Sequence, residues 1–329
     1  MARSLDPQQQ HALVAALADG QWHRGETLAE RFGIGRAALS KRVEQLADWG
    51  LGVQSQAGVG YRLASALELL DETCIRAAGG ELLSGLSLHC AGWIDSTNTA
   101  VLASEFPDPQ AQLAEGQSAG RGRRGRHWVS PYAHNLYLSL GWRFDGWLPQ
   151  LSALPLAVAV MIWRVLQRHR VPDLHIKWPN DLLVGGAKLG GILIENQGEA
   201  GGACRVVIGI GLNLAMPDSA AQQIDQQWTS LTACLEQAPG RNQLAGELLA
   251  QLMTGLSDFE RGGFEPFALD FRRADCLQGQ AVRVEDHGRF EDGIAKGIGA
   301  QGALRFQPNG GAERLLYSGD VSVRRQVAS

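Results

Sequence analysis

The segment of this 329-residue sequence best suited to binding an anion is a run of glycines and arginines. Residues 120–126 read Gly-Arg-Gly-Arg-Arg-Gly-Arg. Glycine lets backbone N–H groups approach an acceptor closely, and guanidinium groups bind phosphate or carboxylate through paired hydrogen bonds. Because like charges a few ångströms apart repel, we expect this segment to be mobile until an anion neutralises it. The alternative is a solvated or nucleic-acid-binding charge run.

A second segment places cations beside a carboxylate. Residues 177–181 read Lys-Trp-Pro-Asn-Asp, and Lys188 follows with Leu-Gly-Gly after it, all near one predicted β-hairpin. Such a set can neutralise an anion and can orient or accept a proton. Taken alone, the two lysines would more simply be exposed residues at a sheet edge.

Two shorter segments could supply neutral contacts. Ser96, Thr97 and Asn98 follow a predicted strand and offer hydrogen-bond donors and acceptors. Ser96 or Thr97 could instead cap a helix. In Ile208–Asn213, alternating glycines would let a flat ligand approach a buried strand. None of the four segments decides a function alone, but their combination does.

The sequence lacks the patterns of several other protein classes. Its five cysteines are scattered and form no Cys-x-x-Cys pair, so they indicate neither a disulfide framework nor a zinc site, and they favour a reducing compartment. We expect no protein-bound metal site and a cytoplasmic location. The N-terminus lacks the apolar core of a signal peptide, and the apolar stretch Leu154–Trp163 is too short to span a membrane. A net charge of −4 means that any nucleic-acid site is a local patch.

Residues 1–64 predict a winged helix-turn-helix. Asp6 and Pro7 are expected to begin the first of three helices, the third helix runs from Arg36 to Trp49, and a hairpin spans Val53–Leu63. In this plan the third helix faces the major groove of DNA. A small helical bundle for protein contacts is the alternative. The residues expected to contact DNA are Arg36, Ser40, Lys41 and Arg42.

The rest of the chain predicts two further domains. Residues 65–274 alternate strand-like and helix-like segments, which indicates an α+β domain with 65–85 as a linker. Asn135–Trp142 is expected to be a strand with one buried face, and Pro149–Arg170 a long helix with Pro155 in its first turns. Residues 275–329 contain short β-like runs separated by turns, which favour a small barrel.

In order and spacing, these segments resemble the bifunctional biotin–protein ligase and biotin operon repressor family of bacteria. The resemblance covers almost the whole chain and rests on the GRGRRG, KWPND, DST–N and KLGG segments. It implies a multi-domain α+β fold, with an N-terminal winged helix-turn-helix, a central domain related to lipoyl ligases, and an SH3-like C-terminal domain. The segments 64–85, 196–204 and 216–239 match the family less clearly.

The resemblance also implies a reaction. The family forms biotinyl-5′-AMP from biotin and ATP, with magnesium expected on the ATP phosphates. It then transfers biotin to a lysine of the biotin carboxyl carrier protein of acetyl-CoA carboxylase. The adenylate is also the corepressor: ordering residues 120–125 would favour a homodimer that binds biotin operator DNA and represses biotin biosynthesis.

Residue roles follow from the same resemblance. The residues that would bind biotin are Ser96, Thr97, Asn98, Gln117, Arg121, Gly122, Arg123 and Lys188. Those that would bind ATP or the adenylate are Lys177, Lys188, Asn213 and Trp228. Arg121, Arg123 and Lys188 would act in catalysis by offsetting the repulsion between carboxylate and phosphate. Asp181 would orient or deprotonate the acceptor lysine, because an amine with a pKa near 10.4 is almost fully protonated at neutral pH.

Three other functions fit part of the pattern. A lipoate–protein ligase would share the fold, but the arginine run and the N-terminal module argue against it. A regulator that senses biotin without catalysis would not need Lys188 and Asp181. A ligase without repression remains open, because a helix-turn-helix can persist after its operator is lost.

Overall fold

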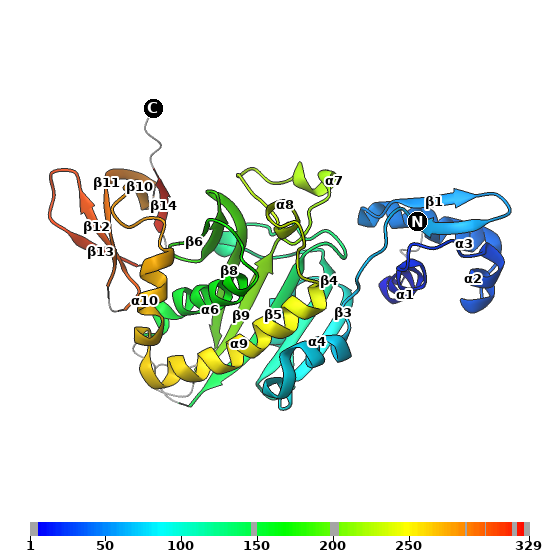
Figure 1. Ribbon diagram of the computed structural model, residues 1–329, viewed down its shortest axis with the longest axis horizontal. Coiled ribbons are helices and arrows are strands. Elements are labelled where there is room, and N and C mark those ends of the chain that lie inside the picture. Colours follow the sequence, from blue (N-terminus) through cyan, green and yellow to red (C-terminus); the bar gives the residue numbers. More distant parts are fainter. Residues whose placement is uncertain are drawn as a thin grey trace.

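The computed structural model describes residues 6–145, 150–197, 204–286, 288–299, 301–317 and 321–325. These residues form three units along the chain. An N-terminal helical unit and a C-terminal sheet lie on opposite sides of a central mixed sheet (Figure 1).

The N-terminal unit consists of three helices followed by a two-stranded hairpin, as the sequence predicts. Asp6 accepts a hydrogen bond from the backbone of Gln8 at the start of the first helix. The third helix, predicted to reach Trp49, ends at Glu44 and continues as a 3₁₀ turn, which Gly50 ends with its positive φ. Leucine and valine side chains fill its core. The elements are α1 (Pro7–Leu17), α2 (Gly25–Arg31), α3 (Arg36–Glu44), a 3₁₀ turn (Gln45–Trp49), β1 (Val53–Gln56) and β2 (Gly60–Leu63).

The central unit is built on a seven-stranded sheet with the order β3-β4-β5-β9-β8-β7-β6. Only β3 and β4 pair in parallel among these described strands. The strands are β3 (Ser87–Ile94), β4 (Gln110–Gln117), β5 (Leu136–Phe144), β6 (Leu174–Lys177), β7 (Asp181–Val184), β8 (Ala187–Gln197) and β9 (Cys204–Leu212). The helices are α4 (Glu72–Gly79), α5 (Thr97–Ala103), α6 (Leu154–Arg168), α7 (Asp218–Ala221), α8 (Leu231–Cys234), α9 (Arg241–Gly262) and α10 (Glu265–Ala274).

The two faces of this sheet have different compositions. Along β9, Ile208, Ile210 and Leu212 belong to the main hydrophobic core, and α6 and α9 cover that face. Gly209 and Gly211 alternate with them and point to the opposite face, which we call the site face. α5 packs on the site face against β4, β5 and β9.

One strand prediction was wrong in a specific way. The segment 135–142 was expected to bury one face, but β5 is buried on both faces along most of its length. The reason is its position: β5 lies inside the sheet between β4 and β9, with α9 on one side and α5 on the other.

The long apolar helix is shorter than the predicted Pro149–Arg170. α6 begins at Leu154 with Pro155 in its first turn, where proline is tolerated. Together with the preceding turn, Leu151–Arg168 is long and apolar enough to cross a membrane, with a mean hydropathy of 1.3. However, 61% of this segment is buried inside the protein, as expected for the core helix that packs on α9.

The C-terminal unit is a five-stranded antiparallel sheet with the order β13-β12-β11-β10-β14. Its strands are β10 (Ala281–Asp286), β11 (Arg289–Ile298), β12 (Leu304–Pro308), β13 (Arg314–Leu316) and β14 (Val321–Arg325). The sequence did not indicate β13 or α10. The buried Trp178 of the central unit contacts the C-terminal unit: its indole N–H donates to the Gly302 carbonyl at 3.0 Å.

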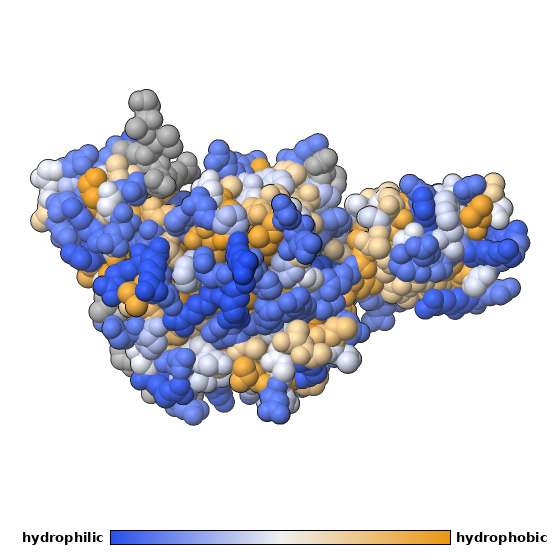
Figure 2. Space-filling view, in the orientation of Figure 1, coloured by the Kyte–Doolittle hydropathy of each residue, from blue (hydrophilic) through white to orange (hydrophobic). Residues whose placement is uncertain are grey.

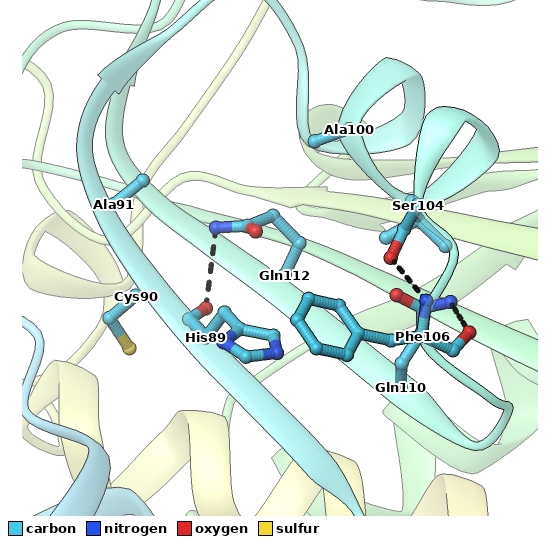
Figure 3. Close-up of a pocket in the computed structure, with 9 residues that line it drawn as sticks. His89, Cys90, Ala91, Ala100, Ser104, Phe106, Gln110 and Gln112 are labelled. Carbon is cyan, nitrogen blue, oxygen red and sulfur yellow. Dashed lines mark hydrogen bonds between the residues drawn. The ribbon is translucent and has the colours of Figure 1, made fainter.

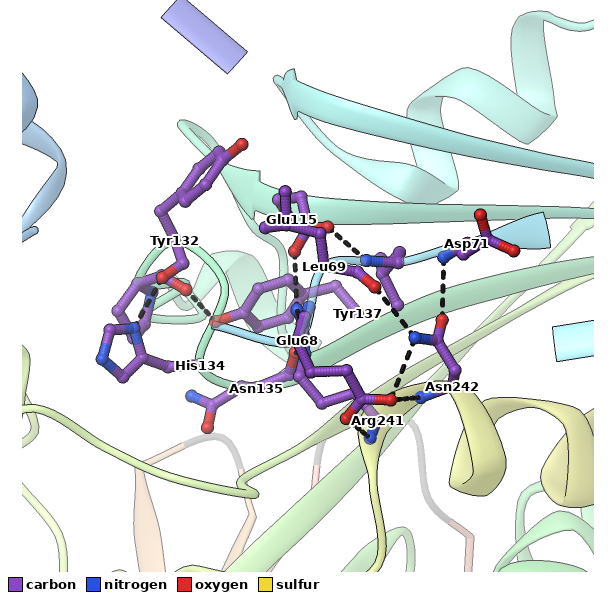
Figure 4. A network of polar contacts seen from close by, with 12 residues as sticks. Glu68, Leu69, Asp71, Glu115, Tyr132, His134, Asn135, Tyr137, Arg241 and Asn242 are labelled. Atoms are coloured by element: carbon purple, nitrogen blue, oxygen red, sulfur yellow. Dashed lines mark hydrogen bonds and ion pairs between the residues drawn. The ribbon is translucent and has the colours of Figure 1, made fainter. Parts of the chain in front are cut away.

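The segment 65–85, expected to be a linker, is largely part of the central unit. It contains α4, which packs against α9. Before α4, Glu68 accepts hydrogen bonds from the backbone N–H groups of Arg241 and Asn242, and so caps the N-terminus of α9 (Figure 4). The Arg241 guanidinium pairs with Glu115 of β4 at 2.6 Å, and both side chains are buried.

Aromatic side chains join the N-terminal unit to the central one. Trp49 stacks on Tyr132 and Trp93, with ring centroids 4.6 and 5.3 Å apart. The Tyr132 hydroxyl lies 2.5 Å from Nδ1 of His11 on α1. Figure 2 shows hydrophobic surface where the two units meet, whereas the outer side of the N-terminal unit is mainly hydrophilic. We call His11, Trp49, Trp93 and Tyr132 the aromatic junction.

Candidate functional site

The site face brings two protein side chains against the glycines of β9. A Cβ atom added at Gly209 would lie 2.2 Å from Oδ1 of Asn98, and one at Gly211 would lie 2.4 Å from the indole of Trp128. The alternating glycines were expected to admit a flat ligand. In the structure they make room for the Asn98 amide and the Trp128 indole, so the lack of side chains at both glycines lets these two groups pack against β9.

The N-terminus of α5 supplies the first predicted cluster. Ser96 caps the helix by accepting from the backbone of Thr99, at 3.5 Å, so the capping role considered for it is present. The backbone N–H of Thr97 donates to Oε1 of Gln117 on β4 at 2.8 Å, and the Thr97 hydroxyl lies 3.2 Å from the same oxygen. Ser96, Thr97, Asn98 and Gln117 are all buried.

Two serines that sequence reasoning missed complete this cluster. Ser139 on β5 lies 2.5 Å from Oδ1 of Asn98, and Ser130 accepts from the amide nitrogen of Gln117 at 3.0 Å. Ser130 in turn donates to the carbonyl of Trp128 at 2.9 Å. The cluster therefore reaches the arginine-rich loop through hydrogen bonds.

The arginine-rich loop adopts a narrow turn. Trp128 N–H donates to the Gly120 carbonyl at 2.8 Å, and Gly122 N–H donates to the Arg126 carbonyl at 2.7 Å. Arg124 has a φ of 59° within a 3₁₀ turn (Arg123–Gly125), a conformation uncommon for residues with a side chain. Backbone hydrogen bonds define this turn, and the mobility expected for the segment before an anion binds stays a prediction.

Two arginines of the loop already have partners from β8 and from the turn after β6. Arg121 pairs with the Glu195 carboxylate at 2.5 Å, and Arg123 donates to Oδ1 of Asn180 at 3.1 Å. Burial lowers the pKa of the Arg123 guanidinium, and the nearby Asp181 carboxylate opposes that change. The first neutralising anion for Arg121 is therefore part of the protein.

The lysine of the second segment lies at the centre of these groups. Lys188 pairs with Asp181 at 2.8 Å, and its ammonium lies 5.4 Å from the centre of the Trp128 ring. Its backbone forms a β-bridge with Trp228, and its carbonyl lies 3.5 Å from the amide nitrogen of Asn213. The structure therefore brings together the residues predicted for the adenylate side.

Lys177 and Gly122 complete the predicted set in the central unit. Lys177 is directly opposite Asp181 in the β6–β7 register, and directly opposite residues project to the same face of a sheet. Gly122 contributes backbone to the arginine loop. The site consequently contains several cations, one ion-paired aspartate, and a buried cluster of neutral polar groups.

The candidate DNA-contacting residues lie together on α3. Arg36 and Lys41 are exposed, and Arg36 pairs with Glu26 of α2. Arg42 instead turns toward α1, where it donates to Gln9. The four predicted residues are Arg36, Ser40, Lys41 and Arg42.

A separate cavity of about 390 Å³ lies at the outer edge of the site face (Figure 3). It is lined by β3, β4 and the C-terminal end of α5, and the exposed Phe106 packs near His89 at its wall. No predicted site residue lines it. It is distinct from the charged site around Lys188.

Comparison with known proteins identifies the family. Residues 91–213 match the Biotin/lipoate A/B protein ligase family, and residues 278–324 match the biotin protein ligase C terminal domain. The bifunctional ligase/repressor BirA of Salmonella typhimurium is 37% identical over 318 residues, covering 95% of this chain and 96% of that protein. BirA of Escherichia coli is 36% identical with the same coverage. The chain belongs to the bifunctional ligase/repressor family.

The match to the Biotin/lipoate A/B protein ligase family extends over the site. Every predicted site residue of the central unit except Trp228 falls within residues 91–213. A biotin protein ligase from Aquifex aeolicus, solved in complex with biotin and ATP, superimposes with a TM-score of 0.62 at 22% identity. It covers 73% of this chain and 99% of its own, and at that identity the likeness establishes a shared fold.

Proposed function

We propose that the protein is an ATP-dependent biotin–protein ligase that also represses transcription of biotin-synthesis genes. In the first step, the biotin carboxylate attacks the α-phosphorus of ATP, forming biotinyl-5′-AMP and releasing pyrophosphate. In the second, a lysine amine of the biotin carboxyl carrier protein attacks the acyl carbon and releases AMP. The observation that carries the proposal is the convergence of Arg121, Arg123 and Lys188 beside the Thr97–Asn98 cluster on one face.

The residues contribute by positioning and by charge. Thr97, Asn98 and Gln117 form a buried polar end suited to the neutral urea of biotin. The cations beside it would offset the repulsion between carboxylate and phosphate as they approach. Neither step needs an enzyme nucleophile. Trp228 and Asn213, which flank Lys188, are the proposed contacts for the nucleoside, and Lys177 is a further phosphate contact.

Magnesium enters the proposal with ATP. The described residues contain no group of three or more metal-ligating side chains, and Asp181 beside the site is already paired with Lys188. This donor set suits an ion held mainly by the nucleotide phosphates. The ion would supply charge neutralisation of those phosphates.

Asp181 is the proposed residue for the second step. It would orient the acceptor amine or accept its proton once that amine replaces Lys188 as its partner. We expect Asp181→Asn to form biotinyl-5′-AMP at near the parent rate and to slow transfer to the carrier by about 100-fold. Single-turnover transfer from preformed adenylate measures this. Transfer at the parent rate would eliminate Asp181 from that role.

Ligase activity is tested directly by biotin-dependent exchange of pyrophosphate into ATP and by labelled-biotin transfer to the carrier protein. Exchange with lipoate in place of biotin, without exchange from biotin, would make the chain a lipoate ligase. Biotin binding with no exchange would make it a sensor.

Repression is proposed from the N-terminal unit, whose three helices and hairpin fit a winged helix-turn-helix with Arg36 and Lys41 exposed on α3. Two such units in a ligand-induced homodimer would reach both half-sites of a palindromic operator. Biotin with ATP should raise the dimer fraction in sedimentation and the affinity for operator DNA. No change in either would leave a ligase without repression.

A further inference from the structure

One carboxylate on β8 joins the two halves of the candidate site. Oε2 of Glu195 lies 2.8 Å from Nδ2 of Asn98 and 2.5 Å from a guanidinium nitrogen of Arg121. Glu195 is directly opposite Val207 in the β8–β9 register and therefore shares the site face with Gly209. Its role does not follow from any of the motifs in the sequence.

Glu195 determines which way the Asn98 amide faces. An ionised carboxylate only accepts hydrogen bonds, so the NH₂ group of Asn98 must point to Glu195 and its oxygen must point away. That oxygen lies 2.5 Å from the Ser139 hydroxyl, which must then donate to it. The absence of a side chain at Gly209 leaves room for the oxygen in this orientation.

The rest of the cluster is consistent with this direction. The Thr97 backbone N–H donates to the oxygen of Gln117, whose NH₂ group donates to Ser130. Because Ser139 gives its one hydroxyl hydrogen to Asn98, the Thr97 hydroxyl, 2.7 Å from Ser139, donates to Ser139. Ser130 donates to the Trp128 carbonyl. Each of these donors is directed toward an acceptor within the protein. Asn98 has two amide hydrogens, and Glu195 engages one of them.

We propose that Glu195 is a positioning residue that fixes the hydrogen-bond direction of this pocket. It makes Asn98 offer an N–H donor to the carbonyl oxygen of a cyclic urea, while it holds Arg121 beside the same pocket. The inference rests on the proposed function, because it specifies how the biotin end is recognised. It predicts selectivity for ligands that place an acceptor, and not a donor, at this position.

Two substitutions of Glu195 distinguish the effect of its hydrogen-bond acceptor from the effect of its negative charge. Both bonds reach the same oxygen of Glu195, so Glu195→Gln can keep that acceptor while removing the charge. Glu195→Ala removes both. Glu105→Ala, an exposed glutamate after α5, is the matched control. Thermal unfolding of each full-length variant measures any general loss of fold.

The assay is biotin-dependent pyrophosphate exchange, run with biotin and with 2-iminobiotin. The second compound carries a guanidinium, with N–H donors in place of the urea oxygen. We expect Glu195→Ala to raise the KM for biotin at least tenfold and the KM for ATP less than threefold. Its preference for biotin over 2-iminobiotin should fall at least fivefold. Glu195→Gln and the control should stay within threefold of the parent on all measures.

The outcomes distinguish this inference from the function on which it rests. A parent protein without biotin-dependent exchange would refute the ligase proposal itself. An active parent with an unchanged biotin preference in Glu195→Ala would refute only the role of Glu195. Equal losses in Glu195→Gln and Glu195→Ala would also refute it, because charge and not the acceptor would then matter. The ratio of the two ligands is measured on one preparation, so partial unfolding does not alter it.

Discussion

Gly209 and Gly211 determine which side chains can lie on the site face of the sheet. Their neighbours Ile208, Ile210 and Leu212 point to the core. Because residues alternate between the two faces of a strand, β9 contributes side chains to the core and leaves space on the site face. Asn98 can lie flat against Gly209 only because no Cβ is present there. The smallness of these residues is therefore a requirement of the pocket.

Gly209→Ala should lower both the affinity for biotin and the stability of the protein. The added Cβ would lie 2.2 Å from the Asn98 oxygen, so the amide must move away from Ser139 and Glu195. We expect a rise of at least tenfold in the KM for biotin and a loss of about 1–3 kcal/mol in unfolding free energy. Gly85→Ala is the control, because a Cβ there meets nothing within 4 Å. An unchanged KM would show that the position of Asn98 is not set by this contact.

For individual residues of the site, the sequence indicated those in motifs but not their hydrogen-bonding partners. Lys188, Asp181 and the arginine run were identifiable because unusual residue types lie close together in the chain. Glu195, Ser130 and Ser139 have ordinary types, and only the strand pairing brings them to the site. Their single available signal is alternation: Glu195 follows Gly191 and Leu193 on the same side of β8.

Among the elements, the start of α9 connects three segments from earlier in the chain, namely residues 68–71, β4 and the residue before β5. Glu68 caps this helix, Asn242 bonds the backbone of Asp71, and Arg241 reaches Glu115 and the carbonyl of Asn135 (Figure 4). The leucine spacing of residues 244–256 is typical of an amphipathic helix. It could not predict the network, because its partners are up to 174 residues apart.

Arg241→Ala should be strongly destabilising because it leaves Glu115 as a buried carboxylate without its cation. Breaking a buried ion pair from one side costs about 3–5 kcal/mol. Arg164→Ala, which breaks a more exposed pair with Asp270, should cost about 1 kcal/mol or less. Urea unfolding of both variants measures the difference. Similar losses in the two proteins would mean that the Glu115 carboxylate finds water or another donor.

In the whole molecule, the N-terminal and C-terminal units each contact a residue that lies close in the chain to a side chain of the central site. The C-terminal unit holds Trp178, which lies two residues before Asn180, the partner of Arg123. The aromatic junction holds Tyr132, which lies two residues after Ser130, the partner of Gln117. Composition and periodicity predicted three units and their order. They did not predict these contacts, since Trp49 fits the helical spacing of its own unit but packs on its neighbour.

Trp49→Ala should loosen the N-terminal unit while leaving it folded. Trp49 makes two stacked contacts across the junction, and each aromatic pair contributes about 0.5–1.5 kcal/mol beyond its buried area. Losing both should shift the docking equilibrium by roughly tenfold or more and increase the radius of gyration measured by small-angle X-ray scattering. Trp22→Ala is the control, because Trp22 packs on Arg62 within its own unit. A scattering profile identical to that of the parent would show that the remaining junction contacts, including His11 with Tyr132, are sufficient to hold the two units together.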